Sequence, residues 1–340
     1  MRLVAVSRLK PGMVVAKSIF GNTGQRLLRQ GVAITERYIE QLRRYGIEVV
    51  YISSDQDIEL RDVISEETRQ MAVRETKRVL ENVQRGATLE MGKVHDVLVK
   101  IIDELFEQED IMVNLVDIRS HDEELFSHSV NVAILSVITG MELELGQKDL
   151  ETLATVGLLH DIGRLFCEDE QHLAKGKEIL ECNGNVEPKV VRAVYQHHEH
   201  WDGTGFPEGL AGKEISRYAR IVAVADKFDW MSANNRYPIE EVIAYIMAMS
   251  GVEFEPQAVR AFLNCVSFYP VGTRVELNTG SSGIVVEANR GFPTRPIVRV
   301  DRNIFGALEP PVELNLLGHP TYFIVKRQED IEDLGEAHDQ

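Results

Sequence analysis

Ionisable side chains at the ends of apolar helical segments constrain this chain more than any other feature. Six of its ten histidines fall between His128 and His200. His160 and Asp161 close the apolar segment TLATVGLL, and Asp226 closes the apolar segment IVAVA. Groups in such positions lose their hydration on folding, which is costly unless a hydrogen-bond partner or a bound ion compensates. The fold must therefore bring these groups to compensating partners.

The spacing of the ionisable groups predicts a shared metal centre. Glu124 and His128 are four residues apart, which places them on one face of a helix. The adjacent His197 and His198 diverge by about 100° on a helix, so this pair can serve two neighbouring ions. A single histidine is more often structural, and only the joint pattern favours coordination. Imidazole and carboxylate without thiolate suit iron, manganese or zinc, and two or three such ions can hydrolyse a phosphoester.

Composition limits the classes of partner. The net charge of -17 disfavours broad contact with a nucleic-acid backbone, although bound metal ions would reverse the local field for a small phosphate ligand. Three cysteines without a CxxC spacing favour a reducing compartment. No apolar run approaches the ~18 residues that a membrane span needs, and the N-terminus lacks a secretory pattern. We therefore expect a cytoplasmic protein with no membrane or nucleic-acid polymer as partner.

The chain of 340 residues is expected to be multi-domain and mainly α. Its N-terminal part combines strand-like segments with one short helix, capped by Thr35 and ended by Gly46. The next segment has a helical apolar pattern, for which a core-facing helix and a dimerising one both fit. The predicted order is a small α+β accessory domain (1–58), a helical connector (59–120), an all-helical catalytic bundle (121–268), a β-rich segment with a hairpin at Gly280 (269–328) and an acidic tail (329–340).

Five sequence strings resemble the HD-GYP subgroup of the HD-domain phosphohydrolases, the bacterial cyclic-di-GMP phosphodiesterases. The strings are HSVNVA from His128, HDIGR from His160, HLAKG from His172, HHEHWDGTGFP from His197 and RIVAVADKFD from Arg220. Their order and content are specific, whereas the dipeptide His-Asp alone would be weak. The resemblance covers residues 121–268 and implies an all-helical HD-type bundle. The opening segment also resembles a small accessory domain that often precedes this unit, and the closing segment resembles a tail that often follows it.

The resemblance implies a complete metal centre. The positions that match the family's metal ligands are Glu124, His128, His160, Asp161, His172, His197, His198 and Asp226. Asp161 would bridge two ions, and Glu124 matches the extra carboxylate of members with three metals. The implied cofactors are two or three divalent ions, usually iron, with manganese as a substitute. Asp161 and Arg164 are the implied catalytic residues, and the implied substrate-binding residues are Arg164, Gly205, Phe206, Pro207 and Arg236.

This chain departs from the family pattern at four places. The family lysine is Arg164, which keeps the charge and can hold a phosphate oxygen but cannot act as a proton donor. The tyrosine of the GYP motif is Phe206. Only seven residues separate Arg164 from His172, which predicts that a lid over the site is missing. The substrate-binding arginine lies one place late as Arg236, and Pro238 replaces a basic residue.

We expect metal-dependent hydrolysis of cyclic-di-GMP to linear pGpG, with GMP as a further product left open. The altered region around Arg236 motivates a first alternative, an HD-fold phosphodiesterase for another cyclic nucleotide or dinucleotide. A second alternative is a catalytically silent module that binds a nucleotide or a protein. The retained ligand set disfavours it, because these groups repel one another without a cation. A homodimer and a protein signalling partner stay open.

Overall fold

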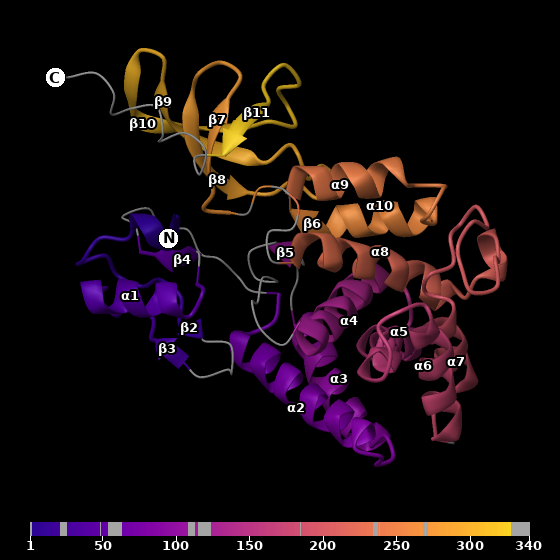
Figure 1. The fold of residues 1–340 in the computed structure, drawn as a ribbon. Coiled ribbons are helices and arrows are strands. Elements are labelled where there is room, and N and C mark those ends of the chain that lie inside the picture. Colours follow the sequence, from indigo (N-terminus) through magenta and orange to yellow (C-terminus); the bar gives the residue numbers. More distant parts are fainter. Residues whose placement is uncertain are drawn as a thin grey trace. The chain divides into compact units, whose positions relative to one another are not determined.

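The structure is a computed structural model, drawn as a ribbon in Figure 1, and its chain divides into two compact units. The structure describes residues 2–20, 26–47, 49–53, 63–107, 113–114, 124–183, 185–233, 237, 239–267, 269 and 271–327. One unit contains residues 62–113 and 117–265 and is helical. The other contains residues 1–61, 114–116 and 266–340. The observed architecture confirms the predicted fold class, mainly α with a small α+β part and a β-rich part.

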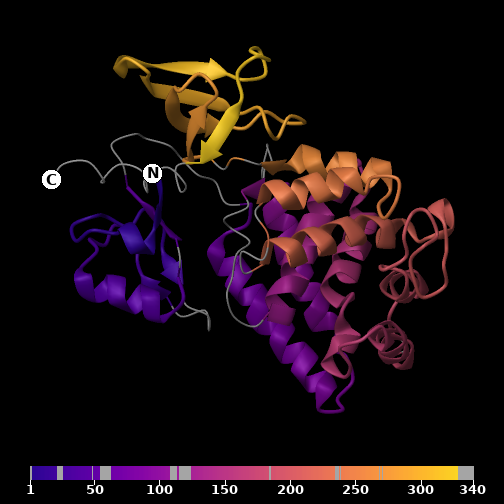
Figure 2. The ribbon, with the colours of Figure 1, turned by 45° about the horizontal axis from the view of Figure 1, so that its top comes forward.

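The helical unit is organised around one central helix (Figure 2). Its helices are α2 (Glu66–Gln84), α3 (Met91–Phe106), α4 (Glu124–Glu142), α5 (Gln147–Leu159), α6 (Gln171–Cys182), α7 (Pro188–Tyr195), α8 (Arg217–Ser232), α9 (Ile239–Ala248) and α10 (Pro256–Cys265), with the 3-10 helices η3 (Ile162–Leu165) and η4 (Gly212–Glu214). Helix α4 contacts α2, α3, α5, α8 and α10. By length and composition, Leu125–Glu142 is apolar enough to cross a membrane, but 72% of this window is buried inside the unit. An apolar helix of this kind is expected at the centre of a bundle.

Helices α2 and α3 account for most of the segment predicted as a connector. They are separated by a turn in which Gly86 has a φ of 90°, a conformation that glycine adopts without strain. Their apolar faces are buried, and they pack on each other and on α4 and α5. This agrees with the core-facing interpretation of the pattern and makes α2 and α3 part of the helical unit. The predicted domain boundaries otherwise stay predictions.

The N-terminal residues form a small α+β structure. It contains β1 (Arg2–Ala5), η1 (Val6–Arg8), β2 (Ile19–Phe20), β3 (Arg26–Leu28), α1 (Glu36–Arg44) and β4 (Val49–Ile52). Strand β1 pairs antiparallel with β4, and β2 pairs antiparallel with β3. The predicted helix ends are confirmed: the Thr35 side chain accepts a hydrogen bond from the Tyr38 amide, and Gly46 has a φ of 68°.

The C-terminal residues form an antiparallel sheet with the strand order β10-β9-β8-β7-β11. Its strands are β7 (Arg274–Leu277), β8 (Ser282–Glu287), β9 (Ile297–Asn303), β10 (Gly306–Asn315) and β11 (Ile324–Arg327); β5 (Val113–Asn114) and β6 (Val266–Ser267) are two-residue strands outside this sheet. The predicted hairpin joins β7 and β8, with Gly280 at a φ of 74°. The predicted acidic tail lies outside the described residues.

Helix α5 approaches α4 closely at Gly157, which makes this glycine a test of the bundle. A Cβ at this position would lie 2.7 Å from the Cα of Ala133 and 2.9 Å from its backbone nitrogen. Backbone atoms cannot move aside as a flexible side chain can. We therefore expect Gly157→Ala to lower the free energy of unfolding by about 1–3 kcal/mol, measured by urea denaturation. Gly92→Ala on α3, where no neighbour would contact the new methyl group, is the control and should leave stability unchanged or raised by up to about 1 kcal/mol. Equal stability of Gly157→Ala and the wild type would contradict this packing.

Candidate metal centre

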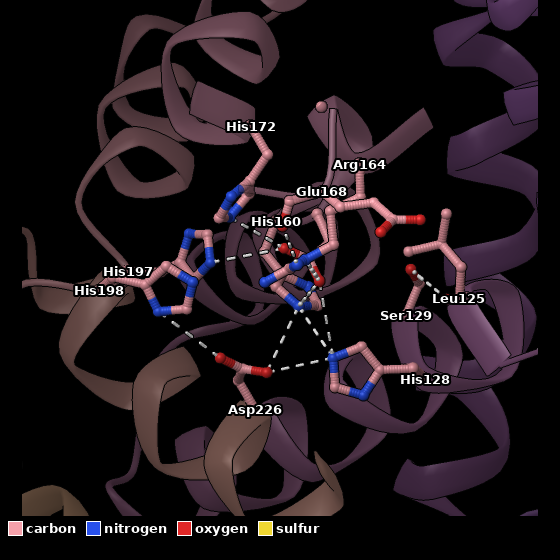
Figure 3. Close-up of polar contacts among 12 residues, drawn as sticks. Leu125, His128, Ser129, His160, Arg164, Glu168, His172, His197, His198 and Asp226 are labelled. Carbon is pink, nitrogen blue, oxygen red and sulfur yellow. Dashed lines mark hydrogen bonds and ion pairs between the residues drawn. The ribbon is translucent and has the colours of Figure 1, made fainter. Parts of the chain in front are cut away.

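The helical unit brings seven of the predicted ligands together, and Figure 3 labels all of them except Asp161. They form two groups, in each of which the ligand atoms lie within 4.8 Å of one another: Asp161, His172, His197 and His198 in the first, and His128, His160 and Asp226 in the second. The side chains come from α4, α6 and α8 and from the turns that follow α5 and α7. The convergence that the sequence analysis required is therefore present, and coordination of ions by these residues remains a prediction.

The short segment between Arg164 and His172 is sufficient to place His172 in the first group. It consists of the end of η3 and a turn that leads into α6. A Cβ at Gly163 in η3 would lie 1.9 Å from the carbonyl oxygen of His172, so η3 packs directly on the backbone of α6. This close approach brings His172 Nε2 to 3.3 Å from Asp161 Oδ1.

Three imidazoles are held in the same orientation by the backbone. His160, His172 and His197 each donate a hydrogen bond from Nδ1 to the carbonyl oxygen three residues earlier, at 2.7 Å in every case. A carbonyl oxygen can only accept, so Nδ1 carries a hydrogen, and in the neutral ring Nε2 then presents a lone pair to the centre. Histidines that bind metal ions characteristically have this second hydrogen bond, which fixes the ring.

Asp161 lies between the two groups, with one oxygen facing each. Its Oδ1 is 3.3 Å from His172 Nε2 and 3.8 Å from His197 Nε2. Its Oδ2 is 3.6 Å from His160 Nε2 and accepts a hydrogen bond from Arg164 Nε at 2.5 Å. The carboxylate is only 5% exposed. Each oxygen thus faces a different set of imidazoles, and the bridging of two ions by Asp161 stays a prediction.

The protonation states of the centre suit cation binding. Burial lowers the pKa of His160 and that of His197, and it lowers the pKa of His198 to about 4. These imidazoles are therefore neutral at pH 7 and can act as ligands. Burial alone would raise the pKa of Asp226, but the hydrogen bond from His128 and the neighbouring histidines outweigh it and hold this pKa below its usual range. The carboxylate is therefore ionised.

His128 differs from the other histidines. Burial acts to lower its pKa, but the hydrogen bonds with Asp226 and Asp229 outweigh burial and hold the pKa of His128 well above its usual value. Its Nε2 lies 3.1 Å from Asp226 Oδ1 and 3.2 Å from His160 Nε2. A positive charge is therefore favoured between these groups, and a divalent cation would supply it there.

Unsatisfied buried atoms indicate that the residues fit divalent metal ions. Among the described residues, Asp161 Oδ1, His172 Nε2 and His197 Nε2 are buried without a hydrogen-bond partner. All three present lone pairs, so they cannot satisfy one another, and each such group costs about 1–3 kcal/mol when left unpaired. One cation bound among them would satisfy all three. The donor set of imidazole nitrogen and carboxylate oxygen suits a divalent transition metal.

The predicted substrate-binding residues lie at the border of the centre where the structure describes them. Arg164 is partly exposed, and its Nη1 donates to the carbonyl oxygen of Glu168. The ring of Phe206 lies 5.1 Å from that of His198, measured between centroids. Pro207 follows in the same loop, in which a Cβ at Gly205 would lie 2.1 Å from the backbone nitrogen of His200. Only glycine fits at that position.

A buried carboxylate holds this loop. Glu199 is 3% exposed, and it accepts hydrogen bonds from the backbone amides of Glu208 and Leu210 at 2.7 and 2.9 Å.

Two predicted residues have no described side chain. Arg236 lies outside the described residues, and Glu124 begins α4 but its side chain is not among those described.

The sequence analysis missed Asp229, which contacts the centre from behind His128. Its Oδ2 accepts the hydrogen bond from His128 Nδ1 at 2.7 Å, and the residue is 4% exposed. A signal was present in the sequence, since Asp226 and Asp229 are three residues apart and share one face of α8. The contact between Asp229 and His128 joins residues 101 positions apart. The spacing of residues within one helix does not predict such a contact.

Comparison with known proteins gives two domain matches. Residues 125–231 match the HD domain, and residues 274–334 match the KOW domain associated with the HD domain. The first match includes all seven converging residues, and Glu124 lies one position before it. The second match contains the C-terminal sheet.

Two curated relatives are phosphodiesterases by name. The cyclic di-GMP phosphodiesterase PA4108 of Pseudomonas aeruginosa is 30% identical over 241 residues, which are 64% of this chain and 58% of the relative. The 3'3'-cGAMP-specific phosphodiesterase 2 of Vibrio cholerae is 28% identical over 174 residues, 45% of this chain and 33% of the relative. The chain thus spans less than two thirds of the length of either relative.

A solved structure shares the fold. Bd1817, an HDG"Y"P protein from Bdellovibrio bacteriovorus, superimposes with a TM-score of 0.52 at 18% identity, covering 76% of this chain and 97% of Bd1817. At this level of identity the similarity concerns the architecture, and the resemblance to HD-GYP proteins rests on the sequence strings and the curated relatives together.

The position of Asp161 leads to a direct test of the centre. Because its two oxygens face different groups, we expect Asp161→Ala to abolish retention of every tightly bound ion, measured as metal per chain after gel filtration. Glu178→Gln on α6 is the control, since Glu178 is exposed and pairs only with Lys175 in the described contacts. Two tightly held ions in Asp161→Ala would show that this carboxylate does not bridge them.

Proposed function

The chain contains an HD domain and resembles the HD-GYP proteins, and from this premise we propose that it is a metal-dependent phosphodiesterase that hydrolyses a cyclic dinucleotide. One observation carries the proposal: Asp161 belongs to the first group through Oδ1, which lies 3.3 Å from His172 Nε2, and its Oδ2 faces the second group, 3.6 Å from His160 Nε2. A shared carboxylate holds two cations close together, which is the arrangement that phosphodiester hydrolysis uses.

The centre and its border have separate roles in this proposal. The chemistry supplied by bound divalent ions is the acidification of a water molecule and the binding of a phosphate oxygen. Asp161 and the imidazoles would hold the ions in position for this chemistry. Arg164 uses Nε to contact Asp161 and Nη1 to contact the Glu168 carbonyl oxygen, and its remaining guanidinium N–H groups would bind a phosphate oxygen of the substrate. Because a guanidinium does not lose its proton, Arg164 stabilises charge and does not act as a general acid.

Cyclic-di-GMP is the first proposed substrate, with linear pGpG as the product. The name of the Pseudomonas relative supports this choice, whereas the name of the Vibrio relative supports the alternative of another cyclic dinucleotide. The loop that contains Gly205, Phe206 and Pro207, together with Arg236, is the proposed contact for the bases. Iron is the proposed metal, with manganese as a substitute, and Glu124 is the proposed ligand of a third ion. Three free cysteines support the proposed cytoplasmic location.

Incubation of the metal-loaded protein with cyclic-di-GMP, 3'3'-cGAMP and cyclic-di-AMP, followed by chromatography, tests the activity. We expect conversion of cyclic-di-GMP to pGpG to be the fastest reaction, and Asp161→Ala to reduce it below detection because both groups lose a ligand. Faster hydrolysis of another dinucleotide would favour the first alternative. A metal-loaded protein that hydrolyses none of them would favour the silent module, and unchanged turnover in Asp161→Ala would remove the proposed mechanism.

Replacement of Arg164 tests its contact with the substrate. A charge-assisted hydrogen bond is worth about 1.5–3 kcal/mol, so we expect Arg164→Ala to lower kcat/KM by about 10–100-fold. Since Arg164 also contacts Asp161, the metal content of the variant must be measured beside its kinetics. Arg164→Lys should recover part of the loss, because it retains a positive charge. Wild-type kcat/KM in Arg164→Ala would contradict a contact with the phosphate.

A further inference from the structure

A buried chain of hydrogen bonds connects His128 with α2. His128 Nδ1 donates to Asp229 Oδ2 at 2.7 Å. Asn131 Nδ2 donates to Asp229 Oδ1 at 3.0 Å, and Arg69 Nη1 donates to Asn131 Oδ1 at 2.7 Å. Arg69, Asn131 and Asp229 are 8%, 6% and 4% exposed. Burial makes each of these bonds stronger and makes an unpaired member costly.

The direction of every hydrogen bond in this chain is fixed by chemistry. A guanidinium only donates, and a carboxylate only accepts. Asn131 must therefore turn its carbonyl oxygen to Arg69 and its amide nitrogen to Asp229. The carboxylate of Asp229 in turn receives the Nδ1 hydrogen of His128, which directs Nε2 of His128 toward Asp226 in the second group, at 3.1 Å. One orientation of the His128 ring is thus specified by Arg69.

The helices supply these residues at matching positions. His128 and Asn131 are three residues apart on α4, and Asp226 and Asp229 are three residues apart on α8, so each helix presents one predicted ligand and one supporting residue on the same face. Arg69 lies in the first turns of α2, which packs on α4. Because α2 precedes the HD domain match of residues 125–231, the support for His128 includes a residue outside that match.

We propose that Arg69, Asn131 and Asp229 are positioning residues that hold His128 in the orientation needed for the second metal-binding group. The inference rests on the proposed metal centre and extends it to α2. Removal of Arg69 takes away the donor to Asn131 Oδ1, so this bond no longer selects the amide orientation that donates to Asp229. His128 then loses its fixed orientation, although no ligand has been altered. Outer hydrogen-bond partners of this kind typically contribute about 10–100-fold to metal affinity.

Manganese binding by the full-length, metal-depleted protein tests the proposal. We expect Arg69→Met to weaken the binding of one manganese(II) ion per chain by about 10–100-fold, measured by competition with a chelator, while a second ion keeps its affinity. Arg69→Lys should restore part of the lost affinity, since its ammonium group can donate to Asn131. Arg74→Met on the same helix is the matched control, because the Arg74 side chain is 71% exposed, and it should bind manganese as the wild type does.

Two further variants separate positioning from general loss of stability. Leu80→Ala removes a buried side chain of α2 that is 1% exposed, and it should lower the melting temperature without changing manganese affinity. Asn131→Ala interrupts the chain at its middle, and it carries the test if Arg69→Met does not fold. Manganese affinity at the wild-type level in Asn131→Ala would overturn the proposal. An equal loss of affinity for both ions in Arg69→Met would overturn it as well.

The manganese measurement also separates this proposal from the proposed function. If manganese affinity falls in Arg69→Met while even the wild type hydrolyses no cyclic dinucleotide, the proposed activity fails and the positioning role is supported. If the wild type hydrolyses cyclic-di-GMP and Arg69→Met binds both ions with wild-type affinity, only the positioning role is overturned.

Discussion

A single carboxylate between two sets of lone pairs is the interaction on which the rest of this structure depends. Asp161 is 5% exposed, and it faces His172 Nε2 at 3.3 Å on one side and His160 Nε2 at 3.6 Å on the other. The Nε2 lone pair of a neutral imidazole repels a carboxylate oxygen, so this arrangement is favourable only with positive charge between them. Arg164 supplies part of that charge from the edge, through Nε at 2.5 Å. The helices around Asp161 thus converge on a place suited to cations.

Short local contacts give this centre its precision. Three of the imidazoles use the backbone carbonyl three residues earlier, so the chain immediately before each histidine fixes the orientation of its ring. His128 has no such carbonyl contact in the described structure and depends on Asp229 instead. Within the second metal-binding group, His128 is therefore the residue whose orientation relies on tertiary contacts, and the Asn131–Arg69 pair extends this reliance to α2.

Much of the fold and the centre could be predicted from sequence because the informative signals are local. Ionisable groups that close apolar segments, such as His160 with Asp161, predict a buried polar centre without knowledge of the fold. The cap at Thr35 and the turn at Gly280 are likewise properties of a few adjacent residues. Arg69 and Asn131 are 62 positions apart; in sequence Arg69 is an ordinary polar residue of an amphipathic helix, and Asn131 is a polar residue within an apolar one. Only the packing of α2 on α4 distinguishes them from solvent-exposed residues.

The buried polar contacts extend the functional unit beyond the residues that match the HD domain. The HD domain match begins at residue 125. The hydrogen bonds that orient His128 nevertheless continue to Arg69, whose Nη1 lies 2.7 Å from Asn131 Oδ1. A buried guanidinium is costly unless its hydrogen bonds are made, so α2 and α4 stabilise each other's polar residues and cannot be exchanged independently. The C-terminal sheet, by contrast, belongs to the other compact unit, and its buried residues include Val275, Val285 and Val298. Residues 63–107 therefore belong with the metal centre in physical terms, whereas the sheet contributes none of the described residues of that centre.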